Sequence, residues 1–83
     1  MKIGRVLKIA RAISDISAQD AAKRIGISRS YLCMIEKDQR PIQMDTLEEY
    51  ATILDTTASK IVELAEEEIP EPDIRREVAK RLW

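Results

Sequence analysis

The sequence lacks histidine and contains a single cysteine, Cys33, and both features narrow its chemistry. Without histidine there is no imidazole for acid–base catalysis or for zinc ligation. One cysteine excludes a disulfide within the chain. No constellation of nucleophile and base stands out either, so we expect a protein that is not an enzyme and has no metal site and no cofactor.

Glycine and proline are also scarce, with two and three residues in a chain of 83. The abundance of Ala, Ile, Leu, Glu, Lys and Arg favours helices over sheet or disorder. Uncharged apolar runs are only a few residues long, whereas a bilayer-spanning helix needs roughly 20, and no secretory leader is visible. We therefore expect an all-α, cytoplasmic protein without a membrane association.

The net charge of −1 conceals two halves of opposite sign. Residues 1–40 carry a formal charge of +5 and residues 41–83 a charge of −6. A basic half attracts phosphates while an acidic half turns away from them, so this asymmetry favours an oriented approach to nucleic acid. A chance division of solvated charges is the alternative, and charge alone does not decide between them.

Apolar spacing and capping residues divide the chain into helices. Ser17, Ser28 and Thr57 are the expected N-caps, and Gly26 suits a left-handed turn at a helix end. The predicted helices are 2–14, 18–25, 29–37, 44–54 and 58–67, followed after Pro70 and Pro72 by a short helix or arm that carries Ile74, Val78 and Leu82.

Residues 18–37 form the most specific pattern in the sequence. Two short helices that cross closely need a small residue on the inner face of the first, a glycine in the turn and apolar flanking positions. Ala22 and Gly26 meet the first two requirements, and the apolar positions are Ala21, Ile25, Ile27, Leu32 and Ile35. This combination predicts a helix-turn-helix.

The stretch SAQDAAKRIGISRSYLCMIE, residues 17–36, with KDQRP after it, resembles the Cro/repressor/Xre-type helix-turn-helix family, and the resemblance extends over residues 3–65. It implies a five-helix lambda-repressor-like domain, here residues 1–68, that binds double-stranded DNA as a homodimer. The helix at 28–37 would enter the major groove. The chain departs from the family pattern at Ala18, where many members have Gln, at Ala21, where Leu is common, and at Asp38, where Gly is common.

The resemblance also assigns the residues that read bases. Arg29 is the strongest reader, because its guanidinium can donate two hydrogen bonds to guanine, although a phosphate contact is an equal alternative. Ser30 discriminates weakly. Cys33 and Met34 would contact thymine methyl groups; core filling is the alternative for Met34, and a redox switch is a weaker alternative for Cys33.

Phosphate contacts are expected at two places in the motif. The first is the start of the second helix, where the N–H groups of Ala18 and Gln19 point outward. The second is the helix at 28–37 and the residues just after it, where Tyr31, Lys37 and Arg40 are the expected contacts. The resemblance further implies an ion pair between Arg11 and Glu36 that ties the first helix to the end of the third.

The sequence leaves the roles of two regions undecided. Ile61 and Leu64 are the expected dimer contacts, although the monomer's own core can claim the same side chains. The segment 69–83 lies outside the resemblance, and its apolar stripe with Trp83 can dock on the parent domain, extend the dimer or bind another protein.

These observations favour a sequence-specific transcriptional regulator, expected to be a repressor, that binds an inverted-repeat operator as a dimer. The alternative is an antitoxin-like interaction module whose C-terminal arm binds a partner protein. The two hypotheses differ in the role that they give to residues 69–83.

Overall fold

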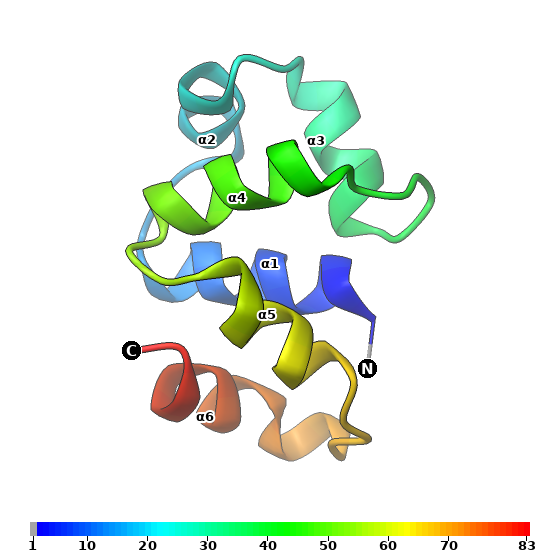
Figure 1. Ribbon diagram of the computed structural model, residues 1–83, viewed down its shortest axis with the longest axis vertical. Coiled ribbons are helices and arrows are strands. Elements are labelled where there is room, and N and C mark those ends of the chain that lie inside the picture. The colour runs from blue at the N-terminus through cyan, green and yellow to red at the C-terminus, as the bar shows by residue number, and fades with distance from the viewer. Residues whose placement is uncertain (1) are drawn as a thin grey trace.

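The computed structural model describes residues 2–83 and shows an all-helical protein (Figure 1). The third helix ends at Glu36 rather than Lys37 and the fifth at Ala65 rather than Glu67, and the final segment is a full helix. None of the helices in residues 2–83 is long and apolar enough to cross a membrane. The helices are α1 (Ile3–Ile13), α2 (Ala18–Ile25), α3 (Arg29–Glu36), α4 (Met44–Ile53), α5 (Ala58–Ala65) and α6 (Glu71–Arg81).

Three helices begin at the hydroxyl caps that the sequence predicts. The side chains of Ser17, Ser28 and Thr57 accept the N–H of the residue three positions later, at 3.0, 3.1 and 3.2 Å. Each cap satisfies one of the N–H groups that a helix start leaves without a partner. The starts of α2, α3 and α5 are therefore fixed by local chemistry.

The helix-turn-helix itself is formed by α2 and α3, at the top of Figure 1. Gly26 ends α2 in the left-handed region with φ of 89°, a conformation that costs glycine little. Ala21 and Ala22 are buried at the crossing, and Leu32 and Ile35 turn the inner face of α3 into the core. The predicted crossing is thus confirmed.

Helix α1 lies in the middle of the molecule and packs against α3, α5 and α6. Its residues Val6, Leu7 and Ala10 are fully buried. The buried apolar side chains of all six helices form one hydrophobic cluster, which holds the helix-turn-helix on the rest of the domain.

Helix α1 approaches the end of α3 closely at Gly4. A Cβ atom on Gly4 would lie 2.3 Å from the carbonyl oxygen of Ile35, well inside van der Waals contact. The Gly4 N–H donates a 2.9 Å hydrogen bond to Oδ1 of Asp38. Asp38 adopts a left-handed φ of 59°, so it takes the backbone conformation that favours glycine and adds a cap for α1.

Helix α6 packs on α1 and α5, so the C-terminal segment docks on its own domain. Ile74, Val78 and Leu82 are buried in the common core. The Trp83 indole N–H donates to the Leu54 carbonyl at 2.6 Å, and Thr56 Oγ1 donates to the Leu82 carbonyl at 2.8 Å. Of the three destinations open to this stripe, the structure shows the first.

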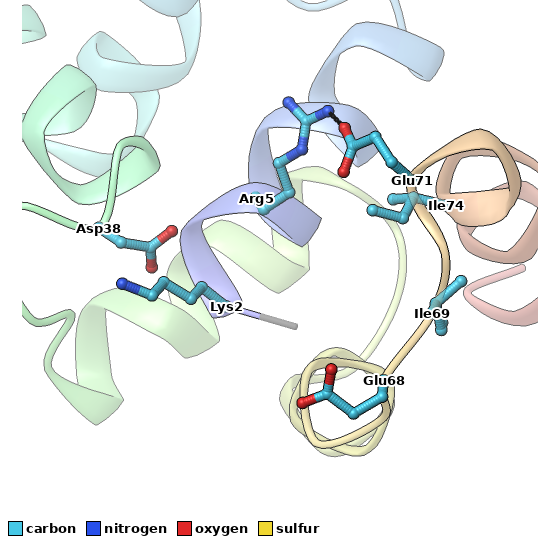
Figure 2. A pocket seen from close by; sticks show the side chains of 7 residues that line it. All are labelled: Lys2, Arg5, Asp38, Glu68, Ile69, Glu71 and Ile74. Carbon is cyan, nitrogen blue, oxygen red and sulfur yellow. Dashed lines mark hydrogen bonds and ion pairs between the residues drawn. The ribbon is translucent and has the colours of Figure 1, made fainter.

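Ion pairs fasten the two ends of α6. Arg81 pairs with Glu67, and Arg5 of α1 pairs with Glu71. The Arg5–Glu71 pair borders a pocket of about 300 Å³ between α1, the segment after α3 and the start of α6 (Figure 2). The pocket is lined by Lys2, Arg5, Asp38, Glu68, Ile69, Glu71 and Ile74.

Candidate nucleic-acid interface

The two faces of α3 have different surroundings. Leu32, Ile35 and Glu36 are buried, whereas Arg29 and Ser30 are exposed. Half-buried Cys33 and Met34 follow one turn after them. The four residues predicted to read bases therefore all retain exposed surface on the same short helix.

The first turn of α3 carries the polar groups available for a ligand. Arg29 and Ser30 follow directly after the Ser28 cap, and the guanidinium of Arg29 makes no hydrogen bond or ion pair with any residue in 2–83. All five guanidinium N–H donors of Arg29 are thus free. Ser30 offers a hydroxyl beside them.

The start of α2 supplies backbone donors. Ser17 takes the N–H of Asp20, while the N–H groups of Ala18 and Gln19 belong to the first turn, where no carbonyl of the same helix can accept them. Gln19 is exposed, whereas the Ala18 side chain packs against the core. Any contact from Ala18 must therefore come from its backbone.

The exit of α3 is cationic. Lys37 is the C-cap residue of α3 and is exposed, and Arg40 follows in the connection to α4. Neither has an ion-pair partner within residues 2–83. The Arg40 guanidinium instead lies over the ring of Tyr31, with Cζ 5.8 Å from the ring centroid.

A buried polar network holds the C-terminal end of α3. Glu36 accepts hydrogen bonds from Arg11 Nε at 2.8 Å and Arg11 Nη2 at 2.9 Å, so the ion pair implied by the resemblance is present. The Tyr50 hydroxyl donates to the same carboxylate. Arg11 also donates to the Ile16 carbonyl at 2.9 Å.

The network raises the pKa of two side chains, Arg11 and Tyr50. Its contact with Glu36 raises the pKa of Arg11 above the ordinary value. Burial, together with the hydrogen bond to Glu36, raises the pKa of the Tyr50 phenol strongly. The sequence alone does not point to Tyr50 as a partner of Glu36; the usable signal is that a buried tyrosine needs a partner for its hydroxyl.

The two residues predicted as dimer contacts take the alternative position that the sequence left open for them. Ile61 is fully buried and Leu64 nearly so, both in the monomer's own core. An inward-facing stripe on α5 has the same spacing as an interface stripe, so the sequence could not separate the two. An apolar side chain that does reach the surface is that of Met44, which is 60% exposed and lies at the start of the neighbouring helix α4.

Among residues 2–83, no three His, Cys, Asp or Glu side chains gather where they could hold a metal ion. The features that do gather are a capped and anchored helix with a free outward face, unpaired cations at its start and exit, and outward backbone N–H groups at the start of α2. This geometry defines a helix-turn-helix of the DNA-binding class.

Comparison with known proteins identifies the family. The family model described as Helix-turn-helix matches residues 5–61, and the chain belongs to this family, of the Cro/C1/Xre type. A solved structure of the SinR protein/SinI protein complex contains a similar chain, with 22% sequence identity and a TM-score of 0.72. The similarity covers 93% of this chain and 78% of that one. No curated protein matches the sequence.

Proposed function

We propose that this protein is a transcriptional repressor that binds an inverted-repeat operator as a dimer, with α3 in the major groove. The observation that carries the proposal is the contrast between the two ends of α3. Glu36 is anchored by Arg11 and Tyr50, whereas Arg29 and Ser30 at the other end are exposed. Helix-turn-helix proteins direct this N-terminal end toward base edges.

Base recognition falls mainly to Arg29. Its free donors suit the O6 and N7 atoms of guanine, and such a bidentate contact discriminates by about 1–3 kcal/mol. Ser30 adds a weak polar contact, and Cys33 and Met34 offer apolar atoms to thymine methyl groups. With one strong polar reader in each half-site, we expect DNA shape and deformability to contribute to operator choice.

Phosphate contacts would orient the protein on the duplex. The backbone of Ala18 and the amide of Gln19 would contact one strand from the start of α2, and Lys37 and Arg40 would contact DNA from the exit of α3. The acidic residues concentrate in residues 41–83. Their repulsion from phosphates favours the orientation that places α2 and α3 against DNA.

A groove between α4 and α5 is the surface that we propose for the second copy. It has a volume of about 400 Å³ and is lined by Met44, Glu48, Ala58, Ser59, Val62 and Glu63. Met44 is the most exposed large apolar side chain among residues 2–83. Covering it in a two-fold interface would replace the contact predicted for Ile61 and Leu64.

The same groove predicts a weak dimer. A stable interface covers about 800 Å² on each partner. The apolar part of this groove comprises three side chains, and Glu48 and Glu63 would bring like charges toward the partner. We therefore expect dimers to form mainly on DNA, where the two recognition helices lie about 34 Å apart.

The proposal places the protein in the cytoplasm with its DNA and gives it no catalytic role. The antitoxin-like alternative has less support. The stripe that would hold a partner consists of Ile74, Val78 and Leu82, and these side chains are buried against the protein's own domain. Partner binding through that stripe would require α6 to leave its place.

The central test is binding to DNA from the protein's own promoter region, measured by fluorescence anisotropy across a salt series. We expect specific complexes at least about 10³ tighter than complexes with unrelated DNA, weakening steeply with salt. Arg29→Ala should cost about 1–3 kcal/mol and relax the preference at one base pair. Arg75→Ala is the matched control, because it removes the same charge from an exposed position on α6.

A second measurement tests the dimer. Met44→Lys should weaken binding to the full inverted repeat while leaving binding to an isolated half-site unchanged. Equal and weak binding of the wild-type protein to every DNA sequence would contradict the proposed function. Equal loss of full-site and half-site binding in Met44→Lys would contradict the proposed interface.

A further inference from the structure

We propose that Tyr31 acts on DNA through Arg40: the face of its ring positions the Arg40 guanidinium for a phosphate beside the half-site. Tyr31 is then a positioning residue, and its hydroxyl is not the contact. The inference rests on the proposed function, since it concerns how the protein holds the operator.

The geometry separates an anchored member of the pair from an exposed one. Tyr31 lies in the first turn of α3, where its N–H donates to Ser28 Oγ at 3.1 Å and its half-buried ring packs against the core. Arg40 is exposed in the connection between α3 and α4. The only interaction of its side chain within residues 2–83 is the one with the Tyr31 ring, 5.8 Å from Cζ to centroid.

This contact holds the guanidinium without using its hydrogen-bonding capacity. The guanidinium lies over the ring, and none of its five N–H donors makes a hydrogen bond to a residue in 2–83. These donors therefore stay free for a phosphate, which a guanidinium can bind with two parallel hydrogen bonds. The pair offers a donor whose position is already restricted before DNA arrives, and this lowers the entropic cost of binding.

The position of the pair connects it with the reading end of α3. Tyr31 follows Arg29 and Ser30 in the first turn of α3, so Arg40 contacts the same helical turn that carries the residues we propose read bases. A phosphate bound there would flank the half-site and help fix the register of α3 in the groove.

Two substitutions of Tyr31 distinguish the ring from the hydroxyl. Tyr31→Phe keeps the ring face and removes the hydroxyl, whereas Tyr31→Leu keeps an apolar side chain and removes the ring. We expect Tyr31→Phe to bind the promoter DNA like the wild type. Tyr31→Leu should bind about two- to fivefold more weakly, the range that corresponds to an exposed cation–π contact.

The coupling to Arg40 is tested by a double-mutant cycle, with helix content and melting temperature checked for each variant. Arg40→Ala should weaken binding and lower the salt slope by about one. In the Arg40→Ala background, Tyr31→Leu should have no further effect, because its partner is absent. A purely structural role of Tyr31 would instead give the same loss in both backgrounds.

Three results would overturn the inference: Tyr31→Phe as weak as Tyr31→Leu, independent losses in the cycle, or wild-type affinity in Tyr31→Leu. Each can be observed while the wild-type protein still prefers its promoter DNA, so the inference can fail without the proposed function. Loss of that preference in the wild type would instead remove the proposed function itself.

Discussion

Replacing Gly4 by alanine should destabilise the protein, although the same change in most helices is favourable. In a helix interior alanine is preferred over glycine by about 1 kcal/mol. Here the new Cβ would lie 2.3 Å from the Ile35 carbonyl oxygen and 2.8 Å from Asp38 Oδ1. Because the first neighbour is backbone, α1 must move away from the end of α3.

The magnitude follows from what this movement removes. The hydrogen bond from the Gly4 N–H to the Asp38 carboxylate is charge-assisted, and such bonds contribute about 1.5–3 kcal/mol. Forcing an extra carbon into a filled site costs a further 1–3 kcal/mol or so. After the gain in helix propensity, we expect Gly4→Ala to lower the free energy of unfolding by about 2–4 kcal/mol and the melting temperature by roughly 10 °C or more.

Urea denaturation followed by circular dichroism measures the effect, and Gly26 supplies the control. A Cβ atom on Gly26 would meet no other atom within 4 Å, but the residue has φ of +89°, so Gly26→Ala is strained by its backbone alone. D-alanine at position 26, introduced by chemical synthesis, should restore or raise stability, because it favours positive φ. A Gly4→Ala protein as stable as the wild type would refute the argument from close approach.

Three further predictions concern the network and α6. Glu36→Gln should lower the free energy of unfolding by about 3 kcal/mol in urea denaturation, because Arg11 loses its buried counter-charge. Since the folded state raises the pKa of Tyr50 above the ordinary value of 10.0, its contribution to stability is complete below about pH 10 and declines as the pH rises further. In Tyr31→Phe, where Tyr50 is the single tyrosine, tyrosinate absorbance should appear only as helix is lost; tyrosinate in a folded protein would contradict this. Leu82→Ala should cost about 2–5 kcal/mol in thermal or urea unfolding, against at most about 0.5 for a substitution on the exposed face of α6.

The sequence predicted those parts of the fold that depend on residues within one helical turn of each other. The caps at Ser17, Ser28 and Thr57 and the turn at Gly26 are local, because a side chain meets the backbone three or four positions away. The Arg11–Glu36 pair spans a longer separation, and it was predictable only through the resemblance to a family.

The remaining features depend on helices meeting in space. The bond from Gly4 to Asp38 spans 34 positions, and the bond from Trp83 to Leu54 spans 29. No periodic pattern in the sequence predicts either of these hydrogen bonds. Likewise, the apolar spacing along α4 and α5 could not show that Met44 is exposed and Ile61 is buried, since a core stripe and an interface stripe have the same spacing.

The two ends of α3 differ in the contacts that their charged side chains make. Glu36 is bound by Arg11 and Tyr50, and Asp38 just beyond it is bound by Gly4, so the C-terminal end of α3 is fixed by groups from α1 and α4. Arg29, at the N-terminal end, has no side-chain partner within residues 2–83. Because its C-terminal end is anchored and the donors of Arg29 are not engaged, α3 would present the residues that we propose read bases in a fixed direction. Substitutions at the free end should therefore alter DNA binding with little effect on stability, whereas those at the anchored end should alter stability first.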